Sequence, residues 1–149
     1  MVGIDIYDIE KDIDRTIYRL TARIPLADAV LNGLVDEELE YGRNLTKKNI
    51  QQYVYALPQG ANTRYKRTYN LLNAVTAGKI RSGGSVVSGQ VYITREKFHR
   101  VYYPVFVEHG EDAGAPYEGR HFWAITVAQL KIDARKKAIM AGRVVARGK

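Results

Sequence analysis

The residues best suited to chemistry in this sequence are Glu108 and His109, with His99 and His121 near them in the chain. A carboxylate and imidazoles can act as general acid and base or hold a metal ion. Their spacing argues against both roles, because there is no His-Glu-x-x-His, no ligand pair at positions i and i+4 and no recognisable Ser-His-Asp context. A metal-dependent hydrolase using Glu108 and His109 remains an alternative for which the sequence suggests no substrate.

The amino-acid composition excludes several kinds of functional site. The chain has no cysteine, which excludes disulfides, thiolate metal sites and a cysteine nucleophile and fits a reducing cytoplasm. We therefore expect a non-enzymatic protein with no catalytic residue, no metal and no cofactor. At 149 residues and 46% hydrophobic content, we expect one globular domain over 1–149. No apolar run approaches the length of a membrane span, and acidic residues near the N-terminus argue against a signal peptide.

Charge is distributed unevenly along the chain. Residues 1–60 carry 7 basic and 10 acidic side chains, whereas residues 61–149 carry 16 basic and 6 acidic ones. A basic half suggests nucleic acid or an acidic protein surface as partner. The alternative is a solvated face that keeps the protein in solution.

Elements that would position these residues follow from apolar spacing, and the first third is predicted to be helical. An amphipathic helix is indicated by apolar residues three or four apart: Ile6, Ile9, Ile13, Ile17, Leu20 and Ile24. Pro25 lacks an amide hydrogen and is expected to break or kink it. A second helix should then end near Gly42, and a short third helix capped by Asn44 or Thr46 should follow.

A β-hairpin is predicted next. Two runs rich in β-branched residues, 75–80 and 86–94, flank the turn Ser82-Gly83-Gly84-Ser85. Such runs across a Gly-Gly turn are typical of an antiparallel pair.

The last predicted element is a helix over Phe122 to Gly142. Its apolar residues recur every three or four positions, and isoleucines recur every seven at Ile125, Ile132 and Ile139. We expect this stripe to be buried against the hairpin, with a loose basic tail from about residue 143. The predicted fold is thus α+β, with N-terminal helices, a small antiparallel β-sheet built on a central hairpin, and a long C-terminal helix packed on the sheet.

Between the hairpin and the last helix lies a segment, 101–123, rich in aromatic residues and marked by prolines. Aromatic and arginine side chains anchor protein interfaces, although roughly half of these aromatics are expected to fill the core instead. A basic loop at 61–69 with interleaved tyrosines is expected to face a neighbouring subunit or nucleic acid, or to lie back on the domain. The residues expected to shape the subunit and its contacts are Tyr102, Tyr103, Phe106, Glu108, Arg120, Phe122 and Trp123, with Arg64, Lys66 and Arg67 in the loop.

Three segments, in order, resemble motifs of the neck or tail-completion proteins of long-tailed bacteriophages. They are Arg67-Thr68-Tyr69-Asn70-Leu71-Leu72-Asn73-Ala74-Val75, Tyr103-Pro104-Val105-Phe106-Val107-Glu108-His109-Gly110 and Gly119-Arg120-His121-Phe122-Trp123. In that family a Thr-Gly-x-Leu segment precedes a hairpin, a Tyr-x-x-Tyr-Val-Glu-x-Gly segment follows it, and an Arg-Pro-Phe segment opens the C-terminal helix. The agreement covers roughly residues 66–140. Tyr69 stands where the family usually has glycine, Pro104 is displaced by one position, and His121 stands where the family has proline.

The resemblance implies a structural virion protein, assembled in the host cytoplasm, that forms a sixfold homo-oligomeric ring at the head–tail junction. Its implied partners are copies of itself, the connector or head-completion proteins and the tail-terminator or tail-tube proteins, around a lumen through which DNA passes. A head-to-tail ring needs two complementary patches per subunit, which an acidic and a basic half can supply. The alternative function is a small basic nucleic-acid-binding module using the loop around Arg64 to Tyr69 and the last helix.

Overall fold

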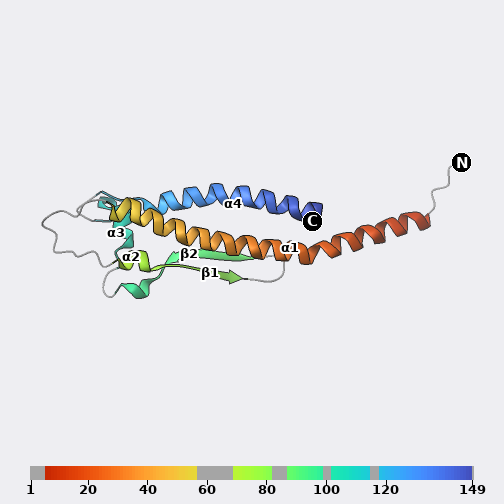
Figure 1. Cartoon of the computed structure of the whole chain (residues 1–149), viewed down its shortest axis with the longest axis horizontal. Coiled ribbons are helices and arrows are strands. Elements are labelled where there is room, and N and C mark those ends of the chain that lie inside the picture. Colours follow the sequence, from red (N-terminus) through yellow and green to blue (C-terminus); the bar gives the residue numbers. More distant parts are fainter. Residues whose placement is uncertain (1–5, 57–68, 82–86, 99–101, 115–117, 149) are drawn as a thin grey trace.

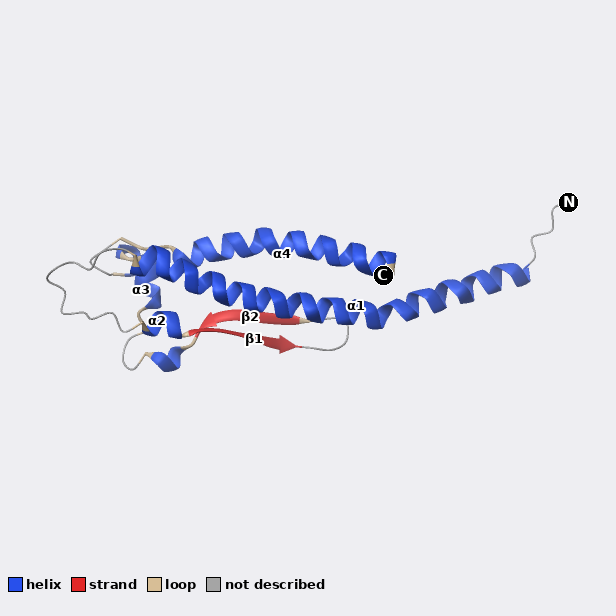
Figure 2. Ribbon diagram, in the orientation of Figure 1, coloured by secondary structure: helices blue, strands red, loops and turns tan. Residues whose placement is uncertain are grey.

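A single long helix, α1 (Ile6–Asn49), forms the centre of the molecule, and the other elements pack along it (Figure 1). The computed structural model describes residues 6–56, 69–81, 87–98, 102–114 and 118–148. The hairpin of β1 (Val75–Arg81) and β2 (Ser88–Ile93) lies against one side of α1, and α4 (Phe122–Arg147) runs antiparallel to α1 beside it. Two short helices, α2 (Asn70–Asn73) and α3 (Pro104–His109), lie at one end (Figure 2). The α+β class is confirmed.

The helical first third differs from the prediction. Pro25 lies inside α1 and does not end it, and the helix passes Gly42 and continues into a π-helical segment over Ile50–Tyr55. Thr46 does not begin a helix, because it lies inside α1, where its hydroxyl donates to the carbonyl of Gly42 one turn earlier at 2.7 Å. Helix α1 tolerates the proline because one lost backbone hydrogen bond costs only a few kcal/mol. The elements packed along α1 stabilise the helix by more than that.

Gly42 marks a close contact and not a helix end. A Cβ at this position would lie 2.9 Å from Val91 Cγ2 and 3.4 Å from the side chain of Leu130. Because Val91 belongs to β2 and Leu130 to α4, the missing side chain lets both elements approach α1. The glycine that the sequence suggested as a stop is therefore where three elements meet.

The predicted hairpin is confirmed, with its turn outside the described residues. Its register pairs Val75 with Ile93 and Arg81 with Ser88, with an irregularity between Lys79 and Arg81. Lys79 ties the hairpin to α1 through an ion pair with Asp36 at 2.9 Å.

The C-terminal helix is longer than predicted. It extends to Arg147 and ends at Gly148, whose φ of 68° is the left-handed conformation that commonly terminates helices. Residues 143–147 are therefore helical, and the predicted loose tail is wrong over that range. The helix packs chiefly along α1 and only weakly on the hairpin, which corrects the expected packing on the sheet.

The fully buried core sits at one end of the molecule, where five elements converge. Ile50, Leu71, Val75, Val107 and Phe122 form it, and each is at most 8% exposed. At the same end a buried polar link also joins α1 to α4, because Asn49 on α1 donates to Thr126 Oγ1 at 2.9 Å and to Gln129 Oε1 at 3.0 Å on α4. The core end is thus the part of the fold that fixes all elements relative to one another.

Candidate functional site

The segment that resembles the phage motifs forms the junction between α3 and α4. Its two halves pair through the backbone: the amide of Arg120 donates to the carbonyl of Val107 at 2.8 Å, and that of His121 to the carbonyl of Glu108 at 3.2 Å. An isolated bridge between Gly110 and Glu118 extends this pairing. We call the residues 102–114 and 118–124 the junction.

Two glycines make this pairing possible. Gly110 has φ 59° and ψ −122°, a combination open to glycine and closed to side chains. At Gly119 a Cβ would lie 2.5 Å from the carbonyl oxygen of Glu108 and 2.8 Å from the carbonyl carbon of His109. The second glycine therefore permits backbone-to-backbone contact that no other residue allows.

Glu108 caps the N-terminus of α4 from a distance in the sequence. Its side chain is 7% exposed, and its Oε2 accepts the amide of Trp123 at 2.8 Å while its Oε1 accepts that of Ala124 at 2.9 Å. The first turn of α4 has no acidic residue, and His121 at the cap position makes no side-chain capping bond. The first amides of a helix have no partner within the helix and carry partial positive charge. The Glu108 carboxylate accepts hydrogen bonds from two of them and places a negative charge beside them.

Within the described residues, no arrangement of side chains supports a hydrolase built on Glu108 and His109. Both carboxylate oxygens of Glu108 are engaged by backbone amides, and His109 on the same helix is exposed. His99 lies outside the described residues. Within the described part of the chain, no group of three histidine, aspartate or glutamate side chains is placed to hold a metal ion.

Aromatic side chains fasten the entrance of α3 to the hairpin and to α2. The hydroxyl of Tyr102 donates to the carbonyl of Ile93 at 3.1 Å, and that of Tyr103 accepts the amide of Leu71 at 3.1 Å. Phe98 packs edge-on against both rings, at centroid distances of 5.4 and 4.8 Å. Burial raises the pKa of Tyr102 above its ordinary value, and Arg95 partly opposes this. The three motif segments thus meet at one packed place.

The other residues proposed for the site divide between core and surface. Phe122 is 1% exposed and belongs to the core, so it shapes the subunit and does not face a partner directly. Phe106, Arg120 and Trp123 are half-buried. The basic loop residues Arg64, Lys66 and Arg67 lie outside the described residues.

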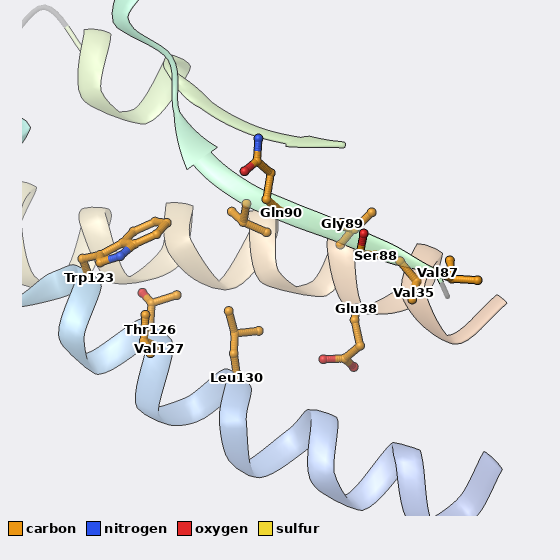
Figure 3. A pocket seen from close by; sticks show the side chains of 12 residues that line it. Val35, Glu38, Val87, Ser88, Gly89, Gln90, Trp123, Thr126, Val127 and Leu130 are labelled. Atoms are coloured by element: carbon orange, nitrogen blue, oxygen red, sulfur yellow. The ribbon is translucent and has the colours of Figure 1, made fainter. Parts of the chain in front are cut away.

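An open groove of about 460 Å³ was not anticipated from the sequence. Figure 3 shows Val35 and Glu38 on α1 and residues 87–90 on or beside β2 bordering it, while Trp123, Thr126, Val127 and Leu130 approach from α4. Its walls are mainly apolar. The spacing of residues in the sequence could not predict this groove. It forms between β2 and α4, which are distant in the sequence, at a part of α1 that neither of them covers.

A cluster of charged side chains links α1 to α4. It consists of Glu38 on α1 and of Asp133 and Lys137 on α4. Lys137 Nζ donates to Glu38 Oε1 and lies 3.0 Å from Asp133 Oδ2. Its ammonium also stands 5.0 Å from the centre of the Tyr41 ring. The bond to Glu38, followed by that to Asp133, raises the pKa of Lys137, and the bond to Lys137 lowers the pKa of Asp133.

The isoleucines that recur every seven residues on α4 do not face the hairpin. Ile132 is 60% exposed and Ile139 is 51% exposed, while Ile125 near the junction is half-buried. The stripe that packs on α1 is instead made of residues such as Leu130, which is half-buried. The prediction that the isoleucine row is buried is wrong for its two outer members, and the row is a surface feature.

No protein-family model, no curated protein and no solved structure matches the chain. No helix within the described residues is long and apolar enough to cross a membrane. What the fold and the junction define is a small α+β domain with two long antiparallel helices and a hairpin.

Proposed function

We propose that this protein is a structural ring subunit at the head–tail junction of a long-tailed bacteriophage, where it joins the connector to the tail around the DNA channel. The observation that carries the proposal is the convergence of the three motif segments. Tyr103 of the second segment bonds to Leu71 of the first, and Glu108 of the second caps the helix opened by the third. These contacts support the proposal, because the three segments are separate in the sequence but pack together in one junction.

The chemistry of the junction supports a structural role. Its single buried carboxylate is used to cap a helix, and its buried aromatics hold elements together. The proposed partners are further copies of the chain, the connector or head-completion proteins and the tail-terminator or tail-tube proteins. In this role the protein is a virion component assembled in the host cytoplasm, and DNA passes through the lumen without sequence-specific binding.

The test is assembly of the full chain. Native mass spectrometry and negative-stain microscopy of the protein, alone and mixed with the connector and tail-tube proteins encoded beside it, should detect a closed ring, with six copies expected. A strict monomer in every mixture would refute the proposal. Neighbouring genes for portal, connector and tail-tube proteins are the supporting observation to seek first.

A nucleic-acid-binding module is the second candidate, and one feature favours it. Cations stand exposed along α4: Lys131, Arg135, Lys136, Arg143 and Arg147. If they contact phosphates, DNA affinity should fall steeply as salt rises, with one counterion-release increment per contact. Weak binding with a flat salt response would reject this function.

A further inference from the structure

The N-terminal part of α1 extends beyond the rest of the described molecule. Figure 1 shows it projecting past the end of α4 and past the hairpin. The end of α4 lies beside Arg23, since a Cβ at Gly148 would be 3.9 Å from Arg23 Nε. We call residues 6–22 the arm. At about 1.5 Å per residue the arm is roughly 25 Å long.

The sequence of the arm is that of an amphipathic helix made to pack. Its apolar residues fall three or four apart, and its first half, residues 6–14, carries four carboxylates and one lysine. The same spacing continues along α1 to Ile24, which is 59% exposed. A helix with such a stripe gains stability chiefly by burying it against another element.

The outward face of α4 has the complementary properties. Ile132 and Ile139 stand exposed in a row with Ile125, and this row spans roughly 21 Å at helical rise. Cations flank it, and the one acidic residue of α4, Asp133, is paired with Lys137. We call the row with its flanking Lys131, Arg135 and Lys136 the α4 face.

We propose that the arm of one copy docks on the α4 face of a second copy, so that the chain associates head to tail. The lengths match, both sequences carry isoleucines at helical spacing, and the acidic half of the arm is complementary in charge to the basic residues of the face. Such a contact joins two different patches and closes into a ring or continues as a filament. This inference rests on the proposed function and gives it a contact.

Two variants of the full chain test each half of the contact. Ile6→Gln/Ile9→Gln/Ile13→Gln removes the apolar stripe of the arm, and Ile132→Gln/Ile139→Gln removes the row of the α4 face. Glutamine is at least as good a helix former as isoleucine, so both helices should persist. The matched control is Ile80→Gln on β1, because Ile80 is 64% exposed and lies on neither patch.

Sedimentation and native mass spectrometry should find concentration-dependent association of the wild type and the control. Each multiple variant should associate roughly 30-fold or more weakly. Mixing the two defective variants supplies one intact arm and one intact face, so a 1:1 heterodimer should form and grow no further. Rescue on mixing distinguishes an arm-to-face contact from one that joins arm to arm or face to face, which mixing cannot restore.

Three results would overturn the inference. The first is a wild type that stays monomeric up to about 100 µM. The second is unchanged association of the Ile132→Gln/Ile139→Gln variant, and the third is no heterodimer on mixing. If Arg135→Glu/Lys136→Glu loses salt-sensitive DNA binding while the isoleucine variants assemble normally, the face belongs to nucleic acid. Rings that form with phage partners in any of these cases leave the proposed function standing without this contact.

Discussion

Replacing Glu108 by glutamine tests whether the junction holds α4 in place. The substitution keeps the shape of the side chain and removes its charge at a site that is 7% exposed. A carboxylate accepts both amides, those of Trp123 and Ala124, at 2.8 and 2.9 Å. A carboxamide has one accepting oxygen, and its NH₂ group would face the second amide donor.

The expected loss follows from these two changes. One buried amide left without an acceptor costs about 1–3 kcal/mol, and removing a negative charge from a helix N-terminus costs roughly 0.3–1 kcal/mol. We expect about 2–3 kcal/mol in the free energy of unfolding. At about 2–4 °C per kcal/mol for a chain of this size, the melting temperature should fall by roughly 4–12 °C.

Circular dichroism at 222 nm, followed during heating and in guanidinium chloride, measures this loss. The matched control is Glu111→Gln, because Glu111 is exposed in the next turn of the same segment and has the same charge. It should melt within about 1 °C of the wild type. A Glu108→Gln variant that melts as the control does would mean that the carboxylate does not stabilise α4, and the structural reading of the junction would fail.

Three further predictions concern backbone contacts, charge and helix entry. Gly119→Ala should lower the free energy of unfolding by about 3 kcal/mol, because the added Cβ would meet rigid backbone at 2.5 Å. Gly142→Ala, whose Cβ would have nothing within 4 Å, should raise the free energy of unfolding by about 0.5–1 kcal/mol. Denaturant titration measures both, and equal effects would contradict the close approach at Gly119. The pKa of Asp133 is lowered by its bond to Lys137, so the folded state binds its proton less readily than the unfolded state and this stability is lost as pH falls below about 4. Asp133→Asn should therefore lose less melting temperature than the wild type between pH 6 and pH 3, and parallel losses would refute the coupling. His121→Gly should stabilise by about 1 kcal/mol by relieving a φ of 49°, and His121→Pro should destabilise, as thermal melts of the two variants can show.

Local patterns predicted the elements that depend on local sequence. The hairpin runs and the start of the last helix at Phe122 are confirmed, because alternation and helical spacing act over a few residues. Pro25 does not break α1 and Gly42 does not end it, for a physical reason. Proline and glycine weaken a helix by a few kcal/mol at most, and tertiary packing along α1 outweighs that local preference.

Packing partners distant in sequence could not be predicted. The sequence shows that isoleucines recur at Ile132 and Ile139, but it does not show which way this row faces. An apolar row on a helix indicates a contact without saying whether the partner lies within the same chain. Likewise, the first turn of α4 has no acidic residue, and its sequence does not say which distant residue caps it. Only the structure identifies Glu108 as that cap.

Two of the three departures from the phage motif pattern share one backbone property. Tyr69 and His121 are the non-glycine residues with positive φ in the described chain, at 56° and 49°. Tyr69 stands where the family has glycine, the residue that adopts this conformation most readily, and its ring contact with Tyr55 at 5.0 Å offsets part of the strain. His121 stands where the family has proline, whose φ is fixed near −65° and which could not donate the amide that bonds to Glu108. The entry into α4 therefore follows a geometry that a proline at position 121 would not allow.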